Sequence, residues 1–440
     1  MVVLGVSALV GTHYEIISII FRLLGSKIGE RVYWPGSGVN IVQYDLLEVG
    51  NDVVFGSRSA VLTRTSHEVC KPASFDDDFL EAGKYKRIEL RSAVLTRSIH
   101  EACKPVIIED GCMVADRCVL LPGTTLKRGS VLGSGSLTRE DCTIPVGSVW
   151  IGCRDGMAVE LQPEDMSFVN KDLVSPFGKA FYQHQSTYYV IPLWGIVGYN
   201  WLWSALCICY KTVPLILSLL IVNHLYQYFG GTSAPNLFIT LLIVLMVLKF
   251  MFDVTALLII IVMKWILIGR RNVGKYGWDV SSYCQRWQIL LTIERISDGL
   301  KNLLQGSYYI VLYFRLLGAK IGTDVCLYPM GADPMMTEPE LVTIGDQSSI
   351  DSASLVGHIN TRGNFALNAL SIGKQCTLKS SSRLLSGATM ENNSIMLEHT
   401  LIMAGDILEK NTVKQGWPAY KEYSMHQYMK QTDLMLDKHF

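Results

Sequence analysis

The sequence predicts a mainly β protein in which two parallel β-helices flank a unit of transmembrane helices. Three observations lead to this. Branched residues recur every six positions over residues 108–151, the same pattern returns 264 residues later, and two long apolar stretches lie between the copies. A period of six fits neither the 3.6-residue period of a helix nor the alternation of a strand. It fits hexapeptide repeats, in which each hexad forms one short face of a parallel β-helix.

Each hexad has a branched position and, four residues later, a small position. The first copy has Ile108, Val114, Leu120, Leu126, Leu132, Thr138 and Ile144, followed by Cys112, Cys118, Thr124, Ser130, Ser136, Cys142 and Ser148. The second has Ile372, Leu378, Leu384, Met390, Met396, Ile402 and Leu408, followed by Cys376, Ser382, Ala388, Ser394, Thr400, Asp406 and Thr412. We expect the branched residue inside the coil and the small residue in its corner. Asp406 alone breaks this rule, and as a buried carboxylate it would need a partner.

Composition narrows the classes of function. The formal net charge is zero, so no basic surface suggests nucleic acid as a partner. The eleven cysteines show neither a Cys-x-x-Cys pair nor metal-ligand spacing, and the sequence therefore predicts no metal site. Several cysteines occupy small positions of the repeat, which favours buried filler in a reducing compartment.

The repeats divide the chain into seven segments. These are an apolar lead-in helix (1–20), the first β-helix (21–160), a linker (161–187), transmembrane helices (188–269), interfacial and lead-in helices (270–313), the second β-helix (314–420) and a tail (421–440).

A younger duplication lies inside the first copy. Residues 58–72 recur almost unchanged as 91–105, an offset of 33 positions, whereas the second copy makes the same connection without the extra block. We therefore expect one block to form the coil and the other to loop out. His67 and His100 are equivalent residues of the two blocks, and only one of them can occupy the native place.

The two apolar stretches, 188–229 and 237–268, each exceed the roughly 20 residues that span a bilayer. Lys249 and Asp253 interrupt the second stretch one helical turn apart, so either they pair inside the membrane or a helical hairpin turns there. Both β-helices should share one compartment, which requires an even number of spans. We favour four spans, with two as the alternative.

Basic residues crowd the exit of the second stretch, at Lys264, Arg270, Arg271 and Lys275. By the positive-inside rule this end faces the cytosol. The sequence thus predicts a multi-pass membrane protein in contact with lipid, with both β-helices cytosolic.

Four motifs together resemble the C-terminal membrane region of nonribosomal-peptide-synthetase-like proteins of the ε-poly-lysine synthetase type. They are the tandem Phe-Arg-Leu-Leu-Gly-x-Lys-Ile-Gly at 21–29 and 314–322, Lys-Trp-Ile-Leu-Ile-Gly-Arg at 264–270, Glu-His-Thr-Leu-Ile-Met-Ala-Gly-Asp at 398–406 and Gln-Gly-Trp-Pro-Ala at 415–419. The hexads and the terminal Gly-x-Pro-Ala also resemble the hexapeptide-repeat acyltransferases.

This resemblance implies that both β-helices are left-handed. It also implies a transferase that forms an amide or ester bond from a thioester donor. The donor would be acyl-CoA or a phosphopantetheine carrier, with no permanently bound cofactor, and the acceptor an amine or a hydroxyl. The sequence departs from the family pattern in lacking adenylation and carrier domains and in ending its first copy with Ile-Gly-Cys-Arg at 151–154.

Acyl transfer to an amine needs a general base, and three histidines are candidate catalytic residues. His358 lies where the hexad rule of the second copy breaks, in a segment flanked by glycines that should leave the coil. His399 stands beside a small position with Glu398 next to it. His100 belongs to the duplicated block. A polar loop or corner residue without a catalytic role is the alternative for each, and no residue of the sequence identifies a cofactor-binding site.

The function predicted from the sequence is a membrane-bound acyl- or aminoacyl-transferase, the condensing part of a nonribosomal-peptide-synthetase-like pathway. The alternative is a non-catalytic β-helix scaffold that gathers a biosynthetic partner at the membrane. The hypothesis of a transporter is supported only by the charged residues Lys249 and Asp253 in the second apolar stretch. For assembly, we expect either a homo-oligomer or packing of the two β-helices against each other.

Overall fold

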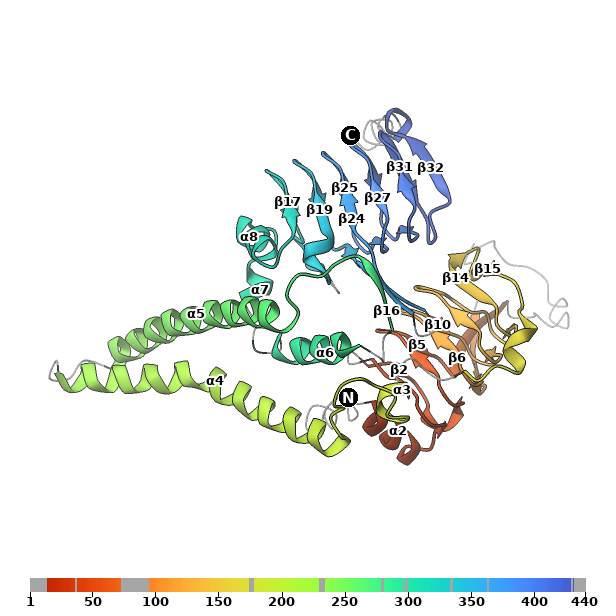
Figure 1. Ribbon diagram of the computed structural model, residues 1–440, viewed down its shortest axis with the longest axis horizontal. Coiled ribbons are helices and arrows are strands. Elements are labelled where there is room, and N and C mark those ends of the chain that lie inside the picture. The colour runs from red at the N-terminus through yellow and green to blue at the C-terminus, as the bar shows by residue number, and fades with distance from the viewer. Residues whose placement is uncertain are drawn as a thin grey trace, which may run out of the picture.

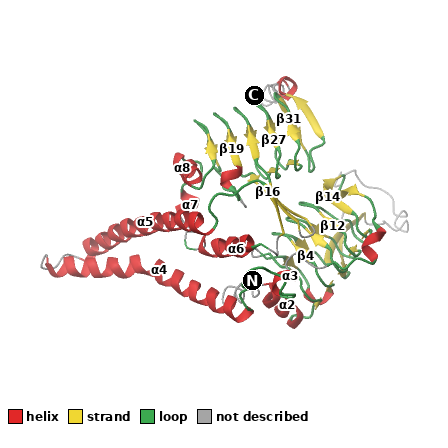
Figure 2. Ribbon diagram, in the orientation of Figure 1, coloured by secondary structure: helices red, strands yellow, loops and turns green. Residues whose placement is uncertain are grey.

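The computed structural model describes residues 14–35, 38–72, 95–173, 178–228, 234–277, 281–294, 296, 300–332, 335–361, 364–428 and 430. Two stacks of short parallel strands lie side by side, and a pair of long helices projects from between them (Figure 1). The strands gather in the two stacks and the long helices lie apart from them (Figure 2). We call residues 27–162 the N-terminal stack and residues 320–424 the C-terminal stack.

The N-terminal stack contains three sheets whose neighbouring strands are parallel except for the last strand, β15. The first sheet consists of β1 (Lys27–Ile28), β3 (Leu47–Val49), β8 (Val106–Ile108), β11 (Thr125–Leu126) and β13 (Thr143–Ile144). The second consists of β4 (Val54–Phe55), β9 (Met113–Val114), β12 (Val131–Leu132), β14 (Val149–Arg154) and β15 (Met157–Gln162). The third consists of β2 (Asn40–Ile41), β5 (Ala60–Val61) and β10 (Val119–Leu120).

Apart from the closing pair β14–β15, consecutive strands of the coil belong to different sheets, so the chain passes each face once per turn. Ile108 pairs with Leu126, and Leu126 pairs with Ile144, which makes one turn three hexads long. The branched residues of the hexads are buried inside the coil: Leu120, Leu126 and Leu132 are completely inaccessible. The six-residue period therefore predicted the interior of this stack correctly.

The C-terminal stack repeats this arrangement. Its first sheet consists of β17 (Lys320–Ile321), β19 (Val342–Ile344), β24 (Leu370–Ile372), β27 (Thr389–Met390) and β30 (Ile407–Leu408). Its second consists of β18 (Cys326–Leu327), β20 (Ser349–Ile350), β25 (Thr377–Leu378), β28 (Ile395–Met396), β31 (Thr412–Gln415) and the antiparallel β32 (Lys421–Ser424). Its third consists of β21 (Ser354–Leu355), β26 (Arg383–Leu384) and β29 (Leu401–Ile402).

Asp406 does not occupy an interior corner, so the expectation of a buried carboxylate is wrong. The residue is exposed, although the other small positions of its copy from Cys376 to Thr400 are buried. The reason is its place in the stack: the next strand, β30, is the last of its sheet, and no further coil covers that corner. An exposed aspartate there meets no desolvation cost.

Each stack sends out one hairpin after its third face. In the N-terminal stack the hairpin consists of β6 (Arg64–Pro72) and β7 (Leu95–Cys103), in which His67 lies opposite His100. In the C-terminal stack it consists of β22 (His358–Thr361) and β23 (Asn364–Leu367). The short strand β16 (Gly274–Gly277) pairs with β23 and completes a three-stranded sheet.

The expectation that one duplicated block forms the coil while the other loops out is wrong. The start of the first block supplies β5, and Arg64–Pro72 of the first block pairs with Leu95–Cys103 of the second as the β6–β7 hairpin. Residues 91–94 of the second block lie outside the described residues. Both blocks carry Val and Thr, which favour strands, and neighbouring segments of that kind can satisfy each other's backbone groups.

Helices connect and cover the stacks. The related α2 (Tyr14–Leu23) and α8 (Tyr308–Leu316) each precede the first strand of a stack. The other helical elements are η1 (Tyr44–Leu46), η3 (Met166–Val169), α3 (Gly178–Phe181), α6 (Ser282–Glu294), α7 (Leu300–Leu303) and η4 (Pro339–Leu341).

The long helices α4 (Leu193–Tyr228) and α5 (Ala234–Leu267) are the two helices in the described chain that are long and apolar enough to cross a membrane. Each apolar stretch forms one helix rather than two, so our preference for four spans is wrong. Pro214 lies within α4 without ending it, and Lys249 pairs with Asp253 along α5 without a turn between them. A pair at this spacing lies on one helix face, which removes the reason for a hairpin there.

The two stacks are joined along their length. At one end, Phe365 and Leu367 of the C-terminal hairpin, together with Leu341, are buried in the hydrophobic core of the N-terminal stack. At the other end, Trp417 donates a hydrogen bond from Nε1 to the carbonyl of Ser134 at 2.7 Å, and the Cys153 amide donates to the Trp417 carbonyl at 2.7 Å. The C-terminal hairpin thus lies between the two cores.

Candidate functional site

His358 opens strand β22, at the point where the chain leaves the C-terminal stack. The preceding strand β21 ends at Leu355, and the hairpin returns to the stack at β24. The sequence-based expectation that this segment leaves the coil is therefore confirmed. Because Phe365 and Leu367 of the returning strand β23 are buried in the N-terminal core, His358 lies between the two stacks.

Glu338 holds one nitrogen of the His358 imidazole. The His358 Nδ1 lies 2.8 Å from Glu338 Oε1, and the side chain of Glu338 is completely buried. The second carboxylate oxygen accepts hydrogen bonds from the Gly357 amide at 2.9 Å and from the Thr337 hydroxyl. All of these contacts fix the carboxylate, which in turn fixes the plane of the imidazole.

The electrostatic balance of this pair favours a basic imidazole. Burial by itself would lower the pKa of His358, but the Glu338 carboxylate, its hydrogen bond and the more distant Asp116 outweigh burial and raise that pKa. Burial likewise opposes ionisation of Glu338, yet His358 and Arg271 hold the pKa of Glu338 below its usual value. The carboxylate therefore remains charged and increases the basicity of the ring.

Aromatic rings enclose the imidazole. Phe365 stacks on His358 with ring centroids 5.4 Å apart, and Trp287 of α6 meets it edge-on at 6.1 Å. About a quarter of the His358 side chain remains exposed. Since Nδ1 is engaged by Glu338, Nε2 is the nitrogen that can meet a ligand.

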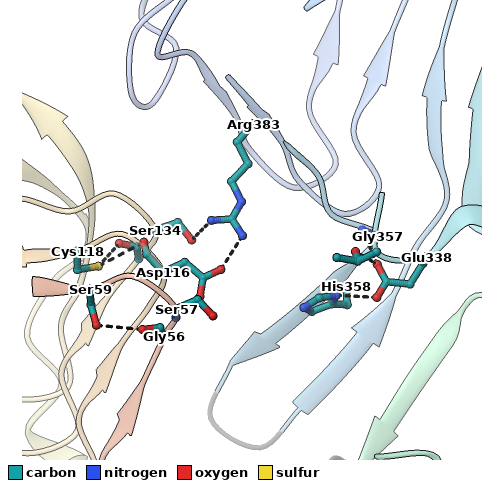
Figure 3. Close-up of polar contacts among 12 residues, drawn as sticks. Gly56, Ser57, Ser59, Asp116, Cys118, Ser134, Glu338, Gly357, His358 and Arg383 are labelled. Carbon is teal, nitrogen blue, oxygen red and sulfur yellow. Dashed lines mark hydrogen bonds and ion pairs between the residues drawn. The ribbon is translucent and has the colours of Figure 1, made fainter. Parts of the chain in front are cut away.

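The N-terminal stack supplies the opposite wall of the site. Figure 3 shows His358 and Glu338 on one side and Ser57, Asp116 and Ser134 on the other. Asp116 accepts from the Ser57 amide at 2.8 Å, and its other oxygen accepts from Arg383 Nη2 at 2.6 Å.

Arg383 reaches across from the C-terminal stack to that wall (Figure 3). Its guanidinium is buried, with 3% of the side chain exposed, and it also approaches the Ser134 hydroxyl at 3.4 Å. Burial would raise the pKa of Asp116, but Arg383 reverses this and holds that pKa below its usual value. The site therefore presents an imidazole of raised pKa from one stack and a carboxylate–guanidinium pair that both stacks share.

The other predicted site residues are not brought to this place. His399 is an exposed corner residue with a backbone φ of 52°, and its contact to the stack is an amide hydrogen bond to the Ser380 carbonyl. His100 lies on the N-terminal hairpin, where its backbone pairs with that of His67. The side chains of these two hairpin histidines fall outside the described residues.

Sequence reasoning missed Glu338, Asp116 and Arg383. Arg383 left a detectable signal, because it occupies the outward position of a hexad strand where Thr377 and Thr389 stand in the neighbouring strands. Glu338 lies in a proline-containing segment outside the hexads, and Asp116 looks like any other polar corner residue. Neither of these two positions breaks the repeat.

Two open grooves lie away from His358. One, of about 550 Å³, is lined by Lys27, Glu48, Asp110 and Arg128 among others, and the second, of about 400 Å³, by Asp346 and Lys374 among others. The charged residues named here form ion pairs with one another. Within the described part of the chain, no three His, Cys, Asp or Glu residues are placed to hold a metal ion.

The buried cysteines of the hexads are poor nucleophiles. Burial raises the pKa of Cys112 and of Cys118 to about 12. A thiol with such a pKa is almost entirely protonated near neutral pH, so these residues serve as filler of the coil.

A curated relative with a similar sequence is the delta-poly-L-ornithine synthetase of Acinetobacter baumannii (strain AB307-0294). The two are 27% identical over 180 residues, which is 40% of this chain and 13% of that synthetase. The chain thus spans about an eighth of the length of this relative. No protein-family model matches the chain.

Solved structures with local likeness include two acetyltransferases and an N-acyltransferase. A hexapeptide-repeat-containing acetyltransferase from Vibrio cholerae is 14% identical and covers 29% of this chain and 86% of its own, with a TM-score of 0.24. A maltose O-acetyltransferase from Clostridium difficile 630 is 12% identical, with coverages of 37% and 96% and a TM-score of 0.25. The N-acyltransferase AntD from Bacillus cereus, in complex with dTDP and 3-hydroxybutyryl-CoA, is 13% identical, with coverages of 32% and 68% and a TM-score of 0.19.

TM-scores this low carry no conclusion about chemistry. The resemblance predicted from the sequence motifs is nevertheless confirmed in its general form, because the curated relative is a delta-poly-L-ornithine synthetase. The similarity to this synthetase agrees with the prediction that the chain is an enzyme.

Proposed function

We propose that the chain is a membrane-bound acyl- or aminoacyl-transferase whose site lies between the two stacks, with His358 as the general base. The observation that carries this is the contact of His358 with the buried Glu338, on a hairpin packed into the opposite stack. In this proposal both stacks are left-handed β-helices, and the seven segments inferred from the sequence are its working units.

The proposed reaction forms an amide from a thioester and an amine. His358 Nε2 takes a proton as the amine attacks the carbonyl carbon, the C–N bond forms, and the C–S bond breaks. The imidazolium then returns the proton to the departing thiolate. Glu338 keeps the Nδ1 proton in place and stabilises the imidazolium, the role of the acid in a catalytic triad. A hydroxyl acceptor would follow the same course and give an ester.

The donor is proposed to be acyl-CoA or a carrier-bound phosphopantetheine thioester, with no permanently held cofactor. The condensing role in a nonribosomal-peptide-synthetase-like pathway is supported by the similarity to the poly-ornithine synthetase. The two long apolar helices support a membrane location with lipid as partner. The basic residues at the end of α5 and just after it support placing both stacks in the cytosol. The packing of one stack on the other favours pairing within one chain over a requirement for a homo-oligomer.

The test is transfer activity of the full chain in membranes, supplied with labelled acyl-CoA and with aminoacyl-carrier thioesters. His358→Ala should lower turnover by about 10²–10⁴-fold, the usual contribution of a general base, while insertion is unchanged. His399→Ala is the matched control, since that side chain is exposed on a distant corner, and His100→Ala tests the third candidate. Full activity of His358→Ala would refute the assignment, and no transfer by the parent chain would favour the scaffold.

A further inference from the structure

The segment from Thr337 to Leu341 connects the C-terminal end of α5 to the His358–Glu338 pair. Glu338 binds the imidazole. Glu340, two residues later in η4, forms ion pairs with Lys264 near the end of α5 and with Arg271 just after it. Leu341 then enters the core of the N-terminal stack. Five consecutive residues therefore touch the long helix, the candidate base and the opposite stack.

Glu340 is held by two cations. The Lys264 ammonium lies 3.0 Å from Oε1, and the Arg271 guanidinium lies 3.2 Å from Oε2. All three side chains are almost completely buried, with 3%, 3% and 1% exposed for Lys264, Arg271 and Glu340. One carboxylate facing two cations leaves one positive charge over.

Arg271 brings that positive charge to Glu338. Its Nη1 also donates to the Thr337 carbonyl at 3.0 Å, immediately before Glu338, and its charge helps to lower the pKa of Glu338. The buried cluster then contains two cations, Lys264 and Arg271, and two carboxylates, Glu338 and Glu340. The charges balance without any contribution from His358.

This balance matters because a general base must begin the reaction uncharged. A buried carboxylate whose only cationic partner was the imidazolium would hold on to the imidazole proton, or would become protonated itself, since an unpaired buried charge is costly. With Arg271 present, Glu338 has a counter-charge in both protonation states of His358.

We propose that Arg271 is a positioning residue that keeps Glu338 ionised and directed at His358 Nδ1 while the imidazole is neutral. This rests on the proposed function, in which His358 is the base. Arg271 touches no reacting atom in this scheme and acts through Glu338. Its place four residues beyond the end of α5 also ties the base to this helix, whose last turn contains Lys264.

The test compares Arg271→Met with Arg271→Lys in the full membrane-embedded chain. Removing the positive charge disfavours the unprotonated pair, which carries a net negative charge, so the pKa of the pair rises. The acid limb of the kcat/KM profile should then move to higher pH by about one unit or more, as expected for losing a nearby opposite charge. Arg271→Lys should restore the limb to the position of the parent.

Other charged groups face the cluster and must be held constant. They are Asp116 and Arg383 from across the site and Tyr283 and Glu294 on α6, where burial raises the pKa of both α6 residues. Glu294→Gln excludes titration of that carboxylate as the source of the limb. Lys127→Met, which removes a half-exposed ion pair with Glu109, is the matched control for loss of a cation.

His358 is also titrated directly by NMR of histidine-labelled protein, with His358→Gln identifying its resonance. The inference is supported if the acid limb of the kcat/KM profile and the midpoint of the NMR titration of His358 both move to higher pH in Arg271→Met. Both should return to the values of the parent in Arg271→Lys. A uniform loss of rate at all pH values with no shift, or no change at all, overturns it. If the parent chain transfers nothing, the proposed function fails, and the NMR midpoint still decides the role of Arg271.

Discussion

At the residue scale, His358 and His399 differ in what contacts the imidazole ring. From the sequence, His358 was expected on a glycine-flanked segment that leaves the second copy, and His399 at one of its corners. Only His358 meets a buried carboxylate, because the hairpin turns it toward Glu338. His399 keeps the left-handed backbone of an ordinary corner and faces solvent.

Glu338→Gln should have two separable effects on transfer. The Gln amide can donate to Nδ1, which leaves the proton on Nε2 and removes the free base, so turnover should fall by about 10²–10⁴-fold. Without the carboxylate, the burial that lowers the His358 pKa is opposed by Asp116 alone. The acid limb of the residual activity should therefore move to lower pH, opposite to the shift expected for Arg271→Met.

The measurement is the pH dependence of kcat/KM for the parent and Glu338→Gln, with Glu398→Gln as control. Glu398 is exposed beside His399 and away from the hairpin. In the parent, the limb should lie above the ordinary histidine value of 6.5, because the pKa of His358 is raised. A limb that stays in place in Glu338→Gln would mean that another group titrates.

At the element scale, the hexads predicted the strands well because burial itself has the period of the sequence. One face of the coil takes six residues, and a single branched residue per face fills the interior, so the pattern records the fold directly. The residues of the two hairpins do not follow the six-residue period. Where β22 begins was foreseeable from the break at His358, but the pairing of β6 with β7 was not, since either duplicated block alone matched the coil.

Deleting residues 58–90 should leave a chain that folds and inserts normally. Arg91-Ser-Ala-Val94 would then follow Ser57 and replace the identical Arg58-Ser-Ala-Val61, which supplies β5. The N-terminal hairpin would be lost. The C-terminal stack joins β21 to β24 through a single hairpin, with no duplicated block. The N-terminal stack should therefore not need its inserted block.

Thermal unfolding followed by circular dichroism, and extraction from membranes, would check this deletion. The midpoint should stay within a few degrees of the parent, since no core residue of the stack is removed without an identical replacement. Transfer activity should persist if His358 is the base, because the deletion leaves Glu338 and the C-terminal hairpin intact. Deleting residues 114–131 instead, one whole coil, is the destabilising comparison. Aggregation of the first deletion would show that the hairpin supports the core.

At the scale of the whole molecule, the two stacks meet along matching corners. Asp116 and Ser134 stand one coil apart on the N-terminal stack, and they meet Arg383 and Trp417 of the C-terminal stack. The sequence indicated the duplication and two long apolar stretches, but contacts between the copies have no period. Glu338, Asp116 and Arg271 therefore could not be brought together without the structure, although His358 could be singled out.

Trp417→Ala should loosen the far end of this interface and lower transfer without unfolding either stack. The indole donates to the Ser134 carbonyl, and a Cβ on Gly135 would lie 2.1 Å from its Nε1, so the ring is packed directly on that backbone. Losing the hydrogen bond and the packing should cost about 1–2 kcal/mol, which corresponds to roughly tenfold in the docked population if docking is marginal.

Hydrogen exchange at the Cys153 amide, which donates to the Trp417 carbonyl, should quicken in proportion. Met330→Ala, at a residue 79% exposed, is the control. Unchanged exchange at Cys153 would mean that the hairpin and the Asp116–Arg383 pair alone hold the stacks together.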